Sequence, residues 1–106
     1  MKPALRLLQH ASRITLFTRS NCSLCDNAKT VLSHVWDRRP FEYEETDVMK
    51  PTEKRWRDLY EFDTPVIHVQ KASLPEQGPE VVSKTLKLMH HFTEQEVERL
   101  MDDSEK

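Results

Sequence analysis

Two cysteines separated by two residues are the feature of this sequence that could carry chemistry. Cys22 and Cys25 enclose Ser23 and Leu24, and they lie between the apolar run of residues 14–17 and a segment with helical periodicity. On one helical turn, a spacing of three residues brings both sulfurs onto the same face, so the second thiolate can displace a mixed disulfide from the first. We therefore expect thiol-disulfide exchange, with Cys22 as the nucleophile and Cys25 as the resolving thiol.

The position of Cys22 at a helix start matters because the thiolate, and not the thiol, is the reactive form of cysteine. The unpaired N–H groups and the positive end of the helix dipole stabilise a thiolate, so Cys22 is expected to be the more acidic thiol. Arg19 lies three residues before Cys22 and is a candidate for a second cationic influence on the site. The alternative for Arg19 is an exposed side chain that is only solvated.

Apolar periodicity predicts the elements that would hold this pair in place. Residues 14–17 are typical of a strand that is buried on both faces. Alternation over residues 41–48 predicts a strand near the sheet edge, and Pro51 can open a second helix. Between them, a stripe at steps of three and four predicts a first helix that runs to about Arg38; its members are Leu24, Ala28, Val31, Leu32, Val35 and Trp36.

The second half of the chain predicts two further strands and a terminal helix. Residues 64–69 and 86–92 read as a hairpin with a long connection, and Thr93 and Glu96 have the spacing of a capping box ahead of a helix that frays after Asp102. The order is therefore β-α-β-α-β-β-α, an α/β fold with a four-stranded mixed sheet flanked by helices. We expect an N-terminal extension over residues 1–12, one domain over residues 13–103 and a tail over residues 104–106.

Composition narrows the function classes. The 106 residues suffice for one domain, and 16 lysines and arginines against 18 acids give no basic field that would attract nucleic acid or an anionic membrane. No apolar run approaches the roughly 18–20 residues that span a bilayer. Two cysteines are too few for a secreted disulfide scaffold, so we expect a cytoplasmic protein. The alternative is a mitochondrial one, because residues 1–19 hold four bases and no acid.

A second motif strengthens the interpretation. Thr64-Pro65-Val66 precedes the third predicted strand, and with the Cys-x-x-Cys pair at a helix start it resembles the thioredoxin superfamily, specifically glutaredoxin-like proteins. The resemblance covers residues 14–101 and implies a thioredoxin-like, glutaredoxin-type fold. It implies a cis bond before Pro65, which faces the cysteines. It also implies a substrate-binding role for Pro65, for the Thr64 backbone and for Arg19, which stands where many glutaredoxins carry a lysine. It further implies a monomer that acts on protein or small-molecule disulfides, with a thioredoxin-type reductant as a possible partner.

The sequence also departs from the glutaredoxin pattern. Ser23 and Leu24 stand where glutaredoxins usually hold a proline and an aromatic residue, so the redox potential cannot be carried over. Paired glycines after the fourth strand are missing, and Glu94 and Glu96 lie at the helix start that would receive a glutathione carboxylate. Glutathione is therefore a poorly matched co-substrate, and we expect no tightly bound cofactor.

Two alternative functions stay open at this point. Cys22 and Cys25 could be half of a metal or iron-sulfur site, but no second Cys-x-x-Cys exists. We interpret all five histidines as surface or half-buried residues and none as a metal ligand; they are His10, His34, His68, His90 and His91. The other alternative is a redox-inactive thioredoxin-fold scaffold that serves only to bind a partner.

Overall fold

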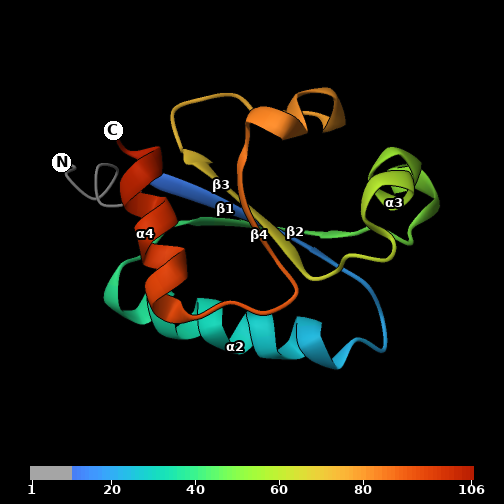
Figure 1. Ribbon diagram of the computed structural model, residues 1–106, viewed down its shortest axis with the longest axis horizontal. Helices are drawn as coiled ribbons and strands as arrows, with labels where there is room; N and C mark the ends of the chain where they lie inside the picture. The colour runs from blue at the N-terminus through green and yellow to red at the C-terminus, as the bar shows by residue number, and fades with distance from the viewer. Residues whose placement is uncertain (1–10) are drawn as a thin grey trace, which may run out of the picture.

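The computed structural model describes residues 11–106, except for the side chains of residues 83 and 84. Segment 1–10, with His10 and most of the expected N-terminal extension, lies outside the described residues. The elements follow the predicted order, with two 3-10 segments added at Pro51–Glu53 and Pro79–Lys84 (Figure 1). Their bounds are β1 Ser12–Thr18, α2 Ser23–Arg38, β2 Glu42–Asp47, α3 Lys54–Tyr60, β3 Val66–Lys71, β4 Leu86–Met89 and α4 Glu94–Ser104.

The four strands form one mixed sheet in the order β2-β1-β3-β4. β1 runs parallel to β2 and antiparallel to β3, and β3 runs antiparallel to β4. The parallel pair requires a crossover, which α2 provides. The predicted fold class is therefore confirmed, and β2 lies at a sheet edge as its alternating pattern indicates.

The central strand β1 sends side chains into two separate cores. Ile14 and Leu16 pack with residues of α2 and α4 on one face of the sheet, whereas Phe17 packs with Tyr60 of α3 and with Val66 on the other. Successive residues of a strand point to opposite faces, which is why a nearly continuous apolar run serves both cores. Figure 1 shows α2 and α4 together and α3 apart from them, at the other end of the sheet.

The fourth strand is shorter than predicted. It ends at Met89 instead of continuing to Phe92, because His90 adopts a left-handed backbone conformation with φ of 63°. Such a conformation cannot continue a strand. In the described residues, none of the helices combines the length and the apolar character that a membrane span needs.

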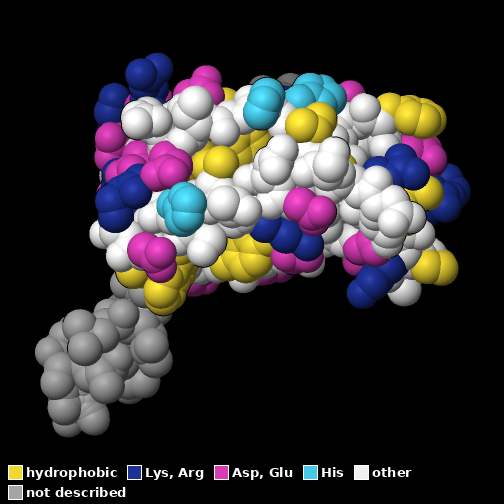
Figure 2. Space-filling model, turned by 90° about the horizontal axis from the view of Figure 1, so that it is seen from below, with side chains coloured by type: hydrophobic (Ala, Val, Ile, Leu, Met, Phe, Trp, Pro, Cys, Tyr) yellow, Lys and Arg dark blue, Asp and Glu magenta, His cyan; other side chains and the backbone are white. Residues whose placement is uncertain are grey.

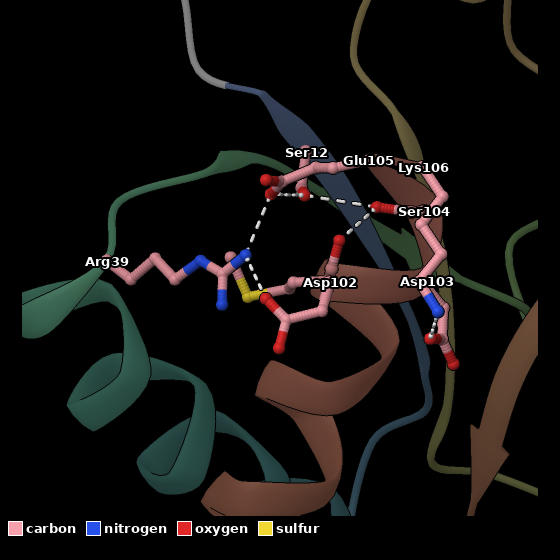
Figure 3. A network of polar contacts seen from close by, with 8 residues as sticks. Ser12, Arg39, Asp102, Asp103, Ser104, Glu105 and Lys106 are labelled. Carbon is pink, nitrogen blue, oxygen red and sulfur yellow. Dashed lines mark hydrogen bonds and ion pairs between the residues drawn. The ribbon is translucent and has the colours of Figure 1, made fainter.

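A polar network joins the residue after α2, the start of β1 and the C-terminal end of α4 (Figure 3). The Arg39 guanidinium lies 2.8 Å from the Asp102 carboxylate and 3.0 Å from that of Glu105. Glu105 also accepts a hydrogen bond from the buried hydroxyl of Ser12 at 2.9 Å, and the hydroxyl of Ser104 lies 3.2 Å from that of Ser12. These contacts explain why α4 continues to Ser104 instead of fraying after Asp102.

A buried polar pair joins α3 to the sheet. The Tyr60 hydroxyl lies 2.6 Å from His68 Nε2, and the rings of Phe17 and Trp56 pack against the imidazole. The expectation that every histidine is surface or half-buried was wrong for His68, which is 6% exposed. Burial, and secondarily the charge of Lys87, lowers the pKa of His68 to about 4, so the imidazole is neutral and its Nε2 can accept a hydrogen bond from the Tyr60 hydroxyl.

Replacing Tyr60 by phenylalanine should destabilise the fold by about 1–3 kcal/mol, because it leaves a buried imidazole nitrogen without a donor. Urea unfolding of the wild type and Tyr60→Phe measures the difference. Tyr43→Phe is the matched control, since the Tyr43 hydroxyl bonds Glu45 at the surface and its loss should change stability by no more than about 0.5 kcal/mol. Equal effects of the two substitutions would contradict the interpretation.

The same pair predicts a pH dependence. The pKa of His68 is about 4 in the folded protein against 6.5 for the ordinary group, so below pH 6.5 the unfolded chain takes up a proton that the folded chain does not. The contribution of the neutral His68 to the free energy of unfolding is fully present above pH 6.5. It is lost as the pH falls toward 4, by up to roughly 3 kcal/mol. The free energy of unfolding, measured with urea between pH 7 and pH 5, should therefore fall more steeply with falling pH for the wild type than for His68→Gln. Parallel pH dependences of the two proteins would exclude His68 as the cause.

Candidate functional site

The cysteine pair lies at the junction of β1 and α2, as its spacing predicts. Cys22 is the N-cap residue of α2, with an extended backbone, and its sulfur accepts a hydrogen bond from the N–H of Cys25 at 3.1 Å. The two residues form a disulfide, with their Cα atoms 5.2 Å apart. One helical turn therefore holds both sulfurs within bonding reach and supplies a backbone donor to the first of them.

The two cysteines differ in their access to solvent. Cys25 is 1% exposed and belongs to the buried face of α2, whereas Cys22 is only half-buried. Between them Leu24 is exposed, and Asp26 lies in the first turn, where its charge complements the helix dipole. An incoming group can therefore reach the sulfur of Cys22, while Cys25 approaches it from inside the fold.

The segment before β3 reaches the same end of the sheet. The Thr64-Pro65 bond is cis, which confirms what the resemblance implies. Pro65 is buried, Thr64 is half-buried, and Val66 pairs with Phe17 near the end of β1. Because Val66 pairs with the end of β1 and β1 leads into the cysteine loop, the candidate substrate-binding residues Thr64 and Pro65 lie at the end of the sheet that carries the cysteines.

Arg19 has a role that the sequence did not indicate. Its guanidinium is half-buried and donates a hydrogen bond to the backbone carbonyl of Glu61 at 2.9 Å. Glu61 immediately follows α3, so this contact fastens the end of α3 to the loop between β1 and α2. The side chain is thus neither merely solvated nor free. A backbone carbonyl has no sequence signature, and no pattern could have named it as the acceptor.

His90 is a second feature of this end that sequence analysis missed. Its N–H donates to the carbonyl of Pro65 at 2.7 Å, and its imidazole Nε2 lies 4.0 Å from the carboxylate of Asp63. Its left-handed conformation follows the fourth strand directly, where many glutaredoxins hold glycines. The signal that could have found this residue was its position, because the residue that replaces a glycine after the fourth strand must itself adopt a left-handed conformation. Histidine is one of the few residues other than glycine that tolerate this conformation.

The three main cavities of the described residues lie away from the cysteines. Three cavities of about 380, 250 and 220 Å³ in the described part of the chain are lined by other residues. The largest lies between α2 and β2, and the second lies beside Trp56 and His68. Residues 11–106 also contain no group of three or more His, Cys, Asp or Glu side chains placed to hold a metal ion. The candidate site is therefore an open surface around a disulfide.

The match to known proteins agrees with this geometry. The family model for the glutaredoxin-like domain (DUF836) matches residues 13–102. The chain belongs to this family. The matched segment includes the cysteine pair and the cis proline, and it covers all four strands and all the helices of the described residues except Ser12 of β1 and the last two residues of α4.

Solved structures show the same fold at low sequence identity. Protein XcR50 from X. campestris is 17% identical, with a TM-score of 0.58, 85% of this chain and 96% of that chain covered. Thioredoxin-2, a component of the malaria parasite protein secretion machinery, is 14% identical, with a TM-score of 0.63 and coverages of 88% and 82%. Oxidised thioredoxin O2 from Arabidopsis thaliana is 12% identical, with a TM-score of 0.61 and coverages of 91% and 76%. These likenesses establish a thioredoxin-like fold for this glutaredoxin-like domain.

Proposed function

We propose that this glutaredoxin-like protein is a thiol-disulfide oxidoreductase that cycles between a Cys22–Cys25 disulfide and the dithiol. The observation that carries the proposal is the position of Cys22, a half-buried sulfur at the helix N-cap that accepts the N–H of Cys25. A sulfur in this position is stabilised as a thiolate and remains accessible to a substrate. The adjacent buried sulfur of Cys25 is within reach to complete the exchange.

The reaction has two displacement steps. The Cys22 thiolate attacks one sulfur of a substrate disulfide, a mixed disulfide forms, and the other substrate sulfur leaves as a thiolate. The Cys25 thiol then loses its proton and attacks the Cys22 sulfur, which releases the second substrate thiolate and leaves the Cys22–Cys25 disulfide. The substrate gains two electrons and the cysteine pair loses them. A dithiol reductant of the thioredoxin type would return the pair to its reduced form.

The start of α4 argues against efficient use of glutathione. Thr93 Oγ1 accepts the N–H of Glu96 at 3.1 Å, and Glu96 Oε1 accepts the N–H of Thr93 at 2.9 Å, so the predicted capping box is present. Arg38, and secondarily His34, hold the pKa of Glu94 below its ordinary value, so this carboxylate stays charged. Glu94 forms ion pairs with Arg38 at 2.8 Å and with His34 at 3.2 Å, so α4 begins beside the last turns of α2, about three helical turns from Cys22. The capped start of α4 therefore offers no carboxylate site next to the cysteines.

Substituting each cysteine in turn tests the proposed function. Cys25→Ser should accumulate a mixed disulfide with its substrate because the resolving thiol is absent, whereas Cys22→Ser should trap none because the accessible nucleophile is gone. Mass spectrometry of each reduced variant, after incubation with a disulfide substrate, measures the adduct. Trapping by Cys22→Ser would reverse the two roles, and trapping by neither variant would favour a binding scaffold without redox activity.

Turnover with glutathione should be slow compared with turnover supported by a thioredoxin-type reductant. Steady-state rates with a glutathionylated small thiol as substrate measure this difference. Glu96→Gln is the matched control: glutamine preserves the capping box, and the rate with glutathione should not change, because α4 begins about three helical turns from Cys22. Wild-type rates equal to those of an ordinary dithiol glutaredoxin, or a faster rate in Glu96→Gln, would contradict this expectation.

A further inference from the structure

One aromatic side chain of this domain is left almost entirely in water. Phe62 is 87% exposed, whereas the other exposed large hydrophobic residues of the described chain are between 37% and 47% exposed. Single exposed apolar residues are normal in proteins, but they usually retain part of their packing. Phe62 contributes little apolar burial to the fold, so packing does not account for a phenylalanine at this position.

Phe62 lies in the connection that borders the cysteine loop. It directly follows Glu61, whose carbonyl accepts the hydrogen bond from Arg19, and Arg19 precedes Cys22 by three residues. Three residues later, Pro65 ends the connection at the start of β3, which pairs with the end of β1. The Arg19 contact therefore places the backbone beside Phe62 against the loop that carries the nucleophile.

A second exposed apolar side chain comes from the other side of the same junction. Leu24 lies in the first turn of α2, two residues after Cys22, and is 38% exposed. We call Leu24 and Phe62 the apolar pair. Figure 2 shows hydrophobic side chains on the surface at the right-hand end of the view, where α2 begins. Two elements that border Cys22 thus each present an apolar side chain to solvent.

The surroundings of the pair favour a macromolecular substrate over a small anionic one. Glu61 and Asp63 flank Phe62, and glutathione carries two carboxylates that these acids would repel. Small-molecule sites are typically concave, yet neither cysteine lines any of the three cavities described above for residues 11–106. Exposed aromatic residues are common anchors in protein interfaces.

We propose that Phe62, assisted by Leu24, binds an apolar side chain next to the disulfide of a protein substrate. The proposal rests on the proposed thiol-disulfide exchange and names its substrate class. Phe62 does not touch the reacting sulfurs. It holds the substrate segment beside Cys22, and Glu61 and Asp63 favour a segment that also carries a basic residue.

Kinetics of the full-length Phe62→Ser variant with two substrates test this proposal. Insulin serves as the protein disulfide, and bis(2-hydroxyethyl) disulfide serves as the small one. The kcat/KM for insulin should fall about tenfold, mainly through KM, because the variant loses the apolar surface that an anchor would bury. The kcat/KM for the small disulfide should stay within about twofold, since that molecule carries no apolar side chain for Phe62 to bind.

Leu74→Ser is the matched control. Leu74 is 47% exposed, and its carbonyl accepts a hydrogen bond from Arg13 at the start of β1, whereas the cysteines follow the end of β1. This variant should process both substrates as the wild type does. An insulin kcat/KM unchanged in Phe62→Ser, an equal loss with both substrates, or an equal loss in Leu74→Ser would overturn the docking role. A wild type inactive toward both substrates would instead overturn the proposed function, and the docking role with it.

Discussion

The strand β1 is the constraint on which the rest of this domain depends. It is the only strand here with a parallel neighbour on one side and an antiparallel neighbour on the other, in the sheet formed by residues 11–106. Ile14 and Leu16 are fully buried on one face, and Phe17 is buried on the other. A strand fixed by two partners and two cores cannot shift its register without exposing apolar side chains on both faces. The loop that follows it, and Cys22 at the next helix start, inherit that fixed position.

The hydrogen bond from Arg19 to Glu61 extends this constraint to a third element. The helix α3 has only seven residues and touches the sheet through the core around Phe17 and Tyr60. Its C-terminal end is otherwise held by that small core and by the hydrogen bond between Tyr60 and His68. A charged donor on a backbone carbonyl makes a comparatively strong hydrogen bond, and this one is partly shielded from water. The connection to Pro65 is therefore held against the cysteine loop from both ends.

Sequence patterns predicted the features that depend on local periodicity, and they missed those that depend on distant partners. The order of elements, the position of Cys22 at a helix start and the capping box at Thr93 all follow from residues within one or two turns of one another. The burial of His68 depends on a tyrosine of another element, and the length of α4 depends on Ser12, 92 residues from Ser104. The anchoring of Arg19 depends on a backbone atom. None of these three contacts has a spacing that a sequence reveals.

The exposure of the site decides where its selectivity must come from. A buried pocket can select a substrate by enclosing it, but Cys22 is only half-buried and lies on an open surface, so it cannot select a substrate in this way. Discrimination then has to arise from contacts beside the reacting sulfur, on elements whose position is already fixed. The first turn of α2 and the connection fastened by Arg19 meet this condition, because both are anchored to β1 and its loop. The exposed side chains on these two elements can vary without disturbing the cores on either face of the sheet, so under the proposed function the reaction and the choice of substrate would be carried by separate residues.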